Sequence, residues 1–506
     1  MTTQNLQHPQ LDALTFASAR AQAQALAEGR VSAVDLLEHV LARIDRFDND
    51  INAVVVRNDE AARAAAREAD ASLARGERRP LLGVPITVKE SFDVAGFVTS
   101  SGNPAYADNV AARDALAVAA LREAGAVIVG KSNVPLALAD LQSYNAIYGV
   151  SNNPWDVSRT PGGSSGGSAA ALAAGYVALE LGTDIGGSIR IPAHFNGVYG
   201  HKPTAGLVAL GGTGVPSGRV ADRDLAVAGP LARSAADLEL ALELLLNREP
   251  LAAKAWKAAL PAARHTRLQD FRVLVIDQWP GTERSLHEQQ VVERVVERLR
   301  TQGVTVGRAA DVAPGLLPDL TLQHRVYRSL LGSSLASPPA LSASAQKRLE
   351  ALAPDDDSAD AAWLRAPTLR HGDWLRDNEA RHVLRQQWER LFETFDVVVT
   401  PVAPLPAFHH NHSEPKDERT YPVEFADGTT REVRFLDLFH WAGLPVLPGL
   451  PATSFPLGLD AQGLPVSAQA VGPYLEDRTT IAFAHLLEQV YGGFIAPPGY
   501  DVDQTA

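Results

Sequence analysis

The stretch from Thr160 to Gly175, TPGGSSGGSAAALAAG, is the feature that most constrains how this chain can fold. Glycine and serine runs form flexible linkers when nothing holds them. Here a second glycine-rich turn, GTDIGGSIR, follows at residues 182–190, and the segment between the two is largely apolar. A tether between domains has no need of such a segment. We therefore expect both turns to be ordered and to lie in a packed part of the fold.

Each turn places a serine after two glycines, Ser164 in the first and Ser188 in the second. Glycine adopts backbone conformations that other residues avoid and lets another group approach the main chain. Successive N–H groups in such a turn can converge on one anionic point. A serine at the end of the turn lies beside those donors. The pattern therefore predicts a nucleophile next to an oxyanion hole, which acyl transfer requires.

A serine nucleophile needs a base, and the residues alone leave three candidates open. His194 and His201 follow Ser188 closely, although histidines so placed more often have structural roles. Lys89 ends the apolar, strand-like segment GVPITVK, where burial would disfavour its charged form and lower its pKa. The alternative for Lys89 is an ordinary ion pair with a neighbouring carboxylate. The Gly-x-Ser-x-Gly motif of α/β-hydrolases does not surround Ser188.

The composition excludes several kinds of site. The chain has 506 residues and no cysteine, so disulfides, thiolate nucleophiles, zinc–thiolate sites and iron–sulfur clusters are excluded. The formal net charge of -13 disfavours nucleic acid as a main partner, because phosphate binding needs a basic face. His409, His410 and His412 lack the spacing that lets metal ligands converge, so we expect an exposed loop there and no metal.

The sequence also bears on location. The first residues, MTTQNLQHPQ, lack the basic and apolar regions of a secretory signal, and no run of about 18 apolar residues could span a bilayer. We therefore expect no membrane contact and a cytoplasmic location. For the oligomeric state we expect a homodimer.

Hydrophobic patterning predicts one large α/β domain over residues 1–506. Residues 12–78 have helical periodicity and predict an N-terminal helical layer. From Leu81 onward, short apolar strands alternate with helices, which predicts a sheet covered by helices. Residues 250–440 are mostly helical in pattern, and within them residues 406–432 look irregular, with a glycine-containing hairpin turn.

Four segments resemble the amidase signature family and occur in that family's order. They are GVPITVKESFDVAG, NPWDVSRTPGGSSGGSAAALAAG, GTDIGGSIRIPAHFNGVYGHKPT and GLPVSAQAVGP. The resemblance is strong over residues 30–240 and extends to the C-terminal strand and helix, whereas residues 250–440 carry little of it. It implies the amidase signature fold, a large mixed β-sheet between layers of α-helices. It also implies that the weakly matching region is variable and supplies much of the substrate pocket.

The resemblance implies roles for individual residues. Ser188 matches the family's nucleophile, Lys89 its catalytic lysine, and Ser164 the serine on a cis peptide that bridges them. The oxyanion hole is matched by the backbone N–H groups of Ile185, Gly186, Gly187 and Ser188. Positions that support this loop are matched by Ser165, Thr183, Asp184 and Arg190. The acyl side of the substrate pocket is matched by Leu138 and Asp140. No metal or organic cofactor is implied.

The implied activity is hydrolysis of carbon–nitrogen amide bonds, with aryl amides, esters and carbamates as further substrates, through an acyl-enzyme on Ser188. Two alternatives stay open. One is the glutaminase subunit of a tRNA-dependent amidotransferase, which works within a complex. The other is a catalytically silent binding protein on the same scaffold. The partner expected for the first is a small-molecule amide or carbamate.

Overall fold

A mixed sheet of 11 strands runs through the part of the chain that the computed structural model describes, residues 9–216, 218, 221–334 and 341–501. In spatial order the strands are β1 (Val54–Arg57), β3 (Val127–Ser132), β2 (Pro85–Lys89), β6 (Leu179–Asp184), β8 (Val227–Ala232), β7 (Tyr199–Lys202), β14 (Ala452–Leu459), β15 (Pro465–Val471), β11 (Val397–Pro401), β9 (Arg272–Val275) and β10 (Thr305–Arg308). Strand β2 is parallel to β3 and β6, and β9 is parallel to β10 and β11. In the middle of the sheet, β8 pairs antiparallel with β6 on one side and with β7 on the other.

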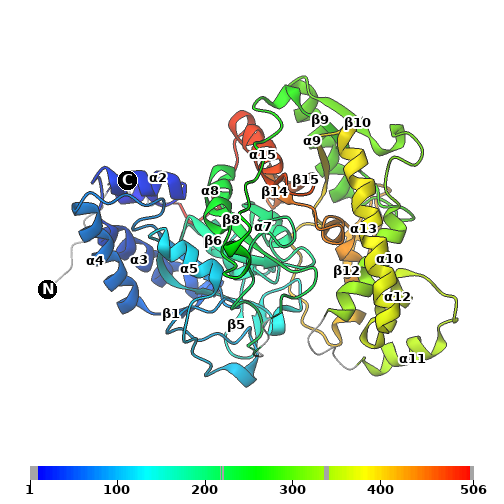
Figure 1. The fold of residues 1–506 in the computed structure, drawn as a ribbon, viewed down its shortest axis with the longest axis horizontal. Coiled ribbons are helices and arrows are strands. Elements are labelled where there is room, and N and C mark those ends of the chain that lie inside the picture. Colours follow the sequence, from blue (N-terminus) through cyan, green and yellow to red (C-terminus); the bar gives the residue numbers. More distant parts are fainter. Residues whose placement is uncertain (1–8, 217, 219–220, 335–340, 502–506) are drawn as a thin grey trace.

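Helices cover this sheet in layers, as the predicted fold class requires. They are α1 (Pro9–Leu14), α2 (Ala19–Ala27), α3 (Ala33–Ile51), α4 (Asp59–Ala74), α5 (Leu116–Glu123), α6 (Gly166–Ala173), α7 (Arg190–Asn196), α8 (Ala235–Leu245), α9 (Leu286–Thr301), α10 (Leu320–Ser333), α11 (Ala343–Ala351), α12 (Ala359–Arg365), α13 (His371–Thr394), α14 (His440–Gly443) and α15 (Asp477–Tyr491). In Figure 1 the blue helices α2–α4 lie at one end and the yellow helices α10, α12 and α13 at the other. No helix of the described residues is long and apolar enough to cross a membrane. The prediction about a secretory signal concerns residues 1–10, most of which lie outside the described ranges.

The N-terminal segment 12–78 is mostly helical, as predicted, but it also contains a strand. Strand β1 lies between α3 and α4 and pairs antiparallel with β3 at the edge of the sheet. Helical periodicity could not reveal it, because four residues between two strongly amphipathic helices carry too short a pattern. The N-terminal layer is therefore joined to the sheet by backbone hydrogen bonds as well as by helix packing.

The weakly matching region 250–440 also contributes to the sheet. Strands β9, β10 and β11 come from it, and they form the edge farthest from β1. The predicted hairpin is confirmed: β12 (Thr420–Glu424) pairs antiparallel with β13 (Thr430–Arg434), and Gly428 in the turn has a φ of 79°. The region is therefore partly structural core, beyond the helices that pack over it.

Helix α6, which follows the first glycine-rich turn, is completely buried. Every residue from Gly166 to Ala173 is buried, and the helix packs on β2, β3, β6 and β8. Its glycine and alanine side chains are small, so the helix can lie close to the sheet. The glycine-rich run is therefore part of the core, as predicted, and it brings Ser164 to the end of strand β2.

Candidate active site

Lys89 lies at the end of β2, and its side chain is completely buried. Its Nζ donates to Ser164 Oγ at 2.7 Å and to Thr183 Oγ1 at 2.7 Å. Burial lowers the pKa of Lys89 from its ordinary value of 10.5 to about 7, although the carboxylates of Asp184 and Glu180 act in the opposite direction. A large fraction of this lysine is therefore neutral near pH 7, and a neutral amine can accept a proton.

Ser164 precedes α6 and follows a cis peptide bond between Gly163 and Ser164, as the resemblance predicts. Its side chain is buried, and Gly163 lies against the chain at 140–142. A Cβ atom on Gly163 would lie 2.6 Å from the carbonyl oxygen of Asp140 and 2.6 Å from the amide nitrogen of Gln142. Only glycine fits there, so close packing holds the turn that presents Ser164 to Lys89.

Ser188 lies between β6 and α7 and is 6% exposed. The N–H of Ser165 donates to the carbonyl oxygen of Ser188 at 3.1 Å, which puts the residue after Ser164 directly against Ser188. The hydroxyl of Ser165 donates to the carbonyl oxygen of Thr183 at 3.4 Å. The fold thus brings the three residues predicted as a triad to one place: Lys89 from the end of β2, Ser164 from the turn before α6, and Ser188 from the turn between β6 and α7.

The carboxylate of Asp184 shapes the turn around Ser188. It accepts from the N–H groups of Gly187 at 2.8 Å and Ile189 at 3.1 Å, and from Arg190 Nε at 3.0 Å and Nη2 at 2.9 Å. Burial disfavours the charged carboxylate, but the guanidinium of Arg190, the N–H of Gly187 and the charge of Lys202 together outweigh this and hold the pKa of Asp184 below its usual range. Arg190 Nη1 in turn donates to Gln469 Oε1 at 2.8 Å. Buried, paired charges therefore fix the loop.

The predicted oxyanion donors divide into two groups. The N–H of Gly187 donates to the carboxylate of Asp184, and this hydrogen bond stabilises the turn. The N–H groups of Ile185, Gly186 and Ser188 have no hydrogen-bond acceptor among the residues that the structure describes. These three are the donors that remain open to a negatively charged oxygen.

Replacing Gly187 with alanine should abolish activity and destabilise the protein by about 1–3 kcal/mol. Gly187 has a φ of 103°, and a Cβ atom there would lie 2.7 Å from the Cβ of Ala442 and 2.7 Å from Cδ1 of Ile191. Urea unfolding and turnover of a reactive ester measure the two effects. Gly428→Ala is the control: its φ is 79° but its Cβ would meet open space, so it should cost stability without loss of activity.

Several residues around the turn were not predicted. Tyr327 on α10 donates to the carbonyl oxygen of Ile185 at 3.2 Å, and Phe439 lies 3.2 Å from where a Cβ on Gly186 would be. Gln469 lies in the quoted segment GLPVSAQAVGP, but nothing in that segment links it to Arg190. These contacts join residues far apart in the chain, and no local pattern reports them.

The two predicted pocket residues have different surroundings. Leu138 is half-buried in a 3₁₀ turn and has a φ of 63°, which is uncommon for leucine. Asp140 is buried, and its carboxylate accepts from Arg419 Nη1 at 2.6 Å and from the hydroxyl of Tyr144 at 3.1 Å. Lys416 Nζ donates to the carbonyl oxygen of Ala139 at 3.0 Å. Asp140 therefore ties the loop next to Gly163 to the segment that precedes β12.

Replacing Arg419 with alanine should lower the free energy of unfolding by about 3–5 kcal/mol, because it leaves the buried carboxylate of Asp140 without its cation. Both side chains of this pair are 0–1% exposed. The matched control is Arg370→Ala, which removes an ion pair with Asp373 whose arginine is 87% exposed and should change stability by less than about 1 kcal/mol. Equal effects in the two variants would contradict the expectation.

The histidines are engaged elsewhere. His194 Nε2 lies 3.2 Å from His287 Nε2, and burial lowers the pKa of His194 to about 4. His201 bonds Thr453 and Asp477. In the 406–432 segment, His410 Nε2 bonds Asn152 Oδ1 at 2.9 Å, and the His412 ring stacks on Tyr144. None of these rings is bonded to Ser188 in the described part of the chain.

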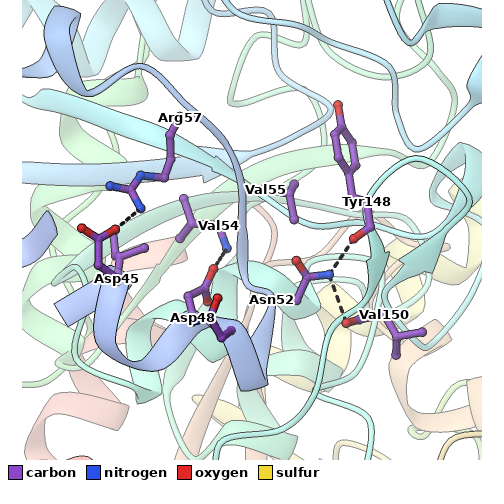
Figure 2. A pocket seen from close by; sticks show the side chains of 10 residues that line it. Asp45, Asp48, Asn52, Val54, Val55, Arg57, Tyr148 and Val150 are labelled. Carbon is purple, nitrogen blue, oxygen red and sulfur yellow. Dashed lines mark hydrogen bonds and ion pairs between the residues drawn. The ribbon is translucent and has the colours of Figure 1, made fainter. Parts of the chain in front are cut away.

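A surface hollow of about 600 Å³ lies on the N-terminal layer and is drawn in Figure 2. Its polar groups bond one another: Asn52 Nδ2 donates to the carbonyl oxygens of Tyr148 and Val150, and Arg57 pairs with Asp45. None of the residues predicted as catalytic lines it. We therefore place the candidate active site at Lys89, Ser164 and Ser188, away from this hollow.

Comparisons with known proteins show the family to which the chain belongs. The protein family described as Amidase matches residues 35–481. The chain is 33% identical to a glutamyl-tRNA(Gln) amidotransferase subunit of Deinococcus deserti, over 96% of this chain and 98% of that protein. It is 32% identical to fatty-acid amide hydrolase 2-A of Danio rerio, over 97% and 91%. A crystal structure described as an amidase superposes with a TM-score of 0.74 at 30% identity, covering 94% of this chain and 100% of the other. The chain therefore belongs to the amidase signature family.

Proposed function

We propose that this chain is an amidase that cleaves carbon–nitrogen amide bonds through an acyl-enzyme on Ser188. Neutral Lys89 takes a proton from Ser164, and Ser164 takes one from Ser188. The Ser188 oxygen then attacks the substrate carbonyl carbon. The negative charge that develops on the carbonyl oxygen is held by the N–H groups of Ile185, Gly186 and Ser188.

The same residues complete the reaction. The ammonium of Lys89 returns a proton through Ser164 to the leaving nitrogen, the carbon–nitrogen bond breaks, and the amine departs. Water then attacks the ester on Ser188, and Lys89 again accepts a proton through Ser164. Lys89 then returns that proton through Ser164 to the Ser188 oxygen, which restores the hydroxyl and leaves Lys89 neutral as the acid is released. The cycle therefore balances without an oxidant or a reductant.

The observation that carries this proposal is the buried 2.7 Å contact between Lys89 Nζ and Ser164 Oγ. A lysine that served only as an ion-pair partner would contact a carboxylate. This one contacts two hydroxyl groups, and burial lowers its pKa to about 7, which is the range a general base needs.

The test is a panel of aliphatic amides, anilides, carbamates and esters with the purified chain. Turnover of at least one of them, together with stoichiometric modification by a fluorophosphonate probe, is the expected result. The panel also identifies the substrate class, because the relative rates distinguish a small amide from a carbamate as the preferred substrate. No turnover of any member by a folded, probe-reactive protein would argue for a partner-dependent enzyme.

A glutaminase subunit is the second candidate, because a relative named as an amidotransferase subunit is 33% identical over nearly the whole chain. Release of ammonia from glutamine only after addition of partner subunits would favour it. Hydrolysis of anilides by the chain alone favours the first proposal. A silent binding protein would show neither turnover nor probe modification. The predicted homodimer and cytoplasmic location stay predictions, which sedimentation and cell fractionation can check.

A further inference from the structure

A buried polar layer lies between the sheet and α6, immediately behind the Lys89–Ser164 contact. Thr87 and Lys89 come to it from β2, Ser132 from β3, Ser168 from α6 and Glu180 from β6, and all five side chains are at most 1% exposed. The hydroxyls of Ser132 and Ser168 bond each other at 2.7 Å. The proposed mechanism assigns a role to Lys89 but none to the carboxylate of Glu180.

Strand register places Glu180 on the same face of the sheet as Lys89. Thr87 is the partner of Glu180 across the parallel β2–β6 pair, so their side chains share a face. Lys89 is two residues further along β2 and therefore also shares it. The same face carries Gly182, where a Cβ would lie 3.0 Å from Ser165 Oγ. Glu180 and Lys89 thus both lie beneath the start of α6.

The carboxylate of Glu180 is incompletely satisfied. Its Oε2 accepts from the N–H of Leu181 at 2.9 Å, whereas Oε1 has no hydrogen bond of good geometry among the described residues. The hydroxyls of Thr87, Ser132 and Ser168 favour its charged form, but burial dominates and raises the pKa of Glu180 to about 7. Burying a carboxyl group without a full set of hydrogen-bond partners lowers the stability of the fold. A group of this kind in a native structure therefore suggests a functional role.

Few other charges face this layer. Asp184 lies further along β6 and attracts the charge of Lys89 more strongly than Glu180 does, but it is paired with Arg190. Lys131 is in register with Val88 and so faces the other side of β3, where it donates to Thr99 Oγ1. Described residues of α6 and β8 contribute no titratable side chain to the layer. Of the two described carboxylates that act on Lys89, Glu180 is therefore the one without a cation partner.

We propose that Glu180 is a positioning residue of the Lys89–Ser164–Ser188 site, whose buried carboxylate attracts the ammonium of Lys89 and so sets the pH at which that lysine becomes a base. This inference rests on the proposed function. When Glu180 is charged, it favours protonated Lys89; when it is neutral, Lys89 loses its proton more easily. The two groups titrate together, so the working pH belongs to the pair.

The experiment measures the rate at which a fluorophosphonate probe modifies Ser188 between pH 5 and pH 9, which requires no knowledge of the substrate. Modification needs neutral Lys89, so the rate in the wild type should rise with pH through about 7. Glu180→Gln removes the attracting charge. Burial raises the pKa of Glu180 to about 7, so this charge is present in the wild type only toward the upper end of the rising limb. The upper part of the variant's limb should therefore lie at lower pH, which makes the variant faster than the wild type near pH 7 and equal to it near pH 5.

Two further variants complete the design. Glu180→Asp withdraws the carboxylate by one methylene and should shift the limb in the same direction by less, so it tests the proposal even where Glu180→Gln does not fold. Glu488→Gln is the control: burial raises the pKa of Glu488 as well, but this residue on α15 does not act on Lys89, and its limb should stay at the wild-type position.

The outcomes are distinct. A lower limb in Glu180→Gln and an unmoved limb in Glu488→Gln support the proposal. An unmoved or higher limb in a folded, probe-reactive Glu180→Gln overturns it and leaves the proposed function standing. A wild type that the probe does not modify at Ser188 overturns the proposed function, and this inference with it.

Discussion

Ser188→Ala should lose turnover by about 10⁴-fold or more and should lose all modification by a fluorophosphonate probe. The reason is that, in the proposed mechanism, the hydroxyl of Ser188 forms the covalent intermediate next to the open N–H groups of Ile185 and Gly186. Mass spectrometry of the modified protein locates the label. The fold should be kept, because alanine fits the same space and the main chain at this position still accepts from Ser165.

The control for this prediction is Ser467→Ala. Ser467 is completely buried on β15, and its hydroxyl has no hydrogen-bond partner among the described residues. Its removal should therefore leave both turnover and labelling close to the wild type. Labelling of Ser188→Ala at another serine would show that the nucleophile has been misassigned.

Lys89→Ala should give a folded but nearly inactive protein, with turnover lower by about a thousandfold or more at pH 7. Burial lowers the pKa of Lys89 from 10.5 to about 7, so between these values the unfolded chain binds the proton that the folded protein lacks. Lys89 therefore destabilises the fold at neutral pH and contributes most at high pH. Its removal is not expected to unfold the chain, which circular dichroism can verify.

The pH profile separates a base from a structural lysine. Because the reaction needs the neutral amine, wild-type activity should fall as the pH drops below about 7. Lys89→Arg keeps the positive charge but cannot accept a proton near neutral pH, so it should be as inactive as Lys89→Ala. A wild-type rate for either variant near neutral pH would mean that another residue is the base.

The fold class and the general location of the site could be predicted from sequence. The glycine-rich run predicted an ordered turn, and the structure confirms this with a completely buried α6. The four family segments predicted the mixed sheet between helices. Their spacing gave no account of β1, because four residues between two helices carry too little periodicity. Nor did they predict that β9, β10 and β11 of the weakly matching region extend the same sheet.

The candidate site likewise has features that were predicted from sequence and features that only the structure shows. The resemblance to the amidase signature family implied Lys89, Ser164 and Ser188 as a triad. In the structure Lys89 bonds Ser164, and the neighbouring Ser165 bonds the main chain of Ser188. The motif predicted Gly187 as an oxyanion donor, but in the structure its N–H is bonded to Asp184. Asp140 was predicted as a pocket residue, and the structure shows its carboxylate paired with Arg419. Each difference depends on which acceptor or cation lies nearest in space.

The sequence by itself therefore determined the chemistry available to this protein: serine hydroxyls on glycine-rich turns, a lysine at the end of an apolar strand, and no thiol. The tertiary structure decided the burial, the hydrogen-bond partners and therefore the protonation state of those groups. Lys89 becomes a candidate base because α6 and the sheet exclude water from it, and Glu180 shares its face of the sheet because β2 and β6 pair in one register. Burial and distance set a proton affinity, and both arise only when distant segments pack together.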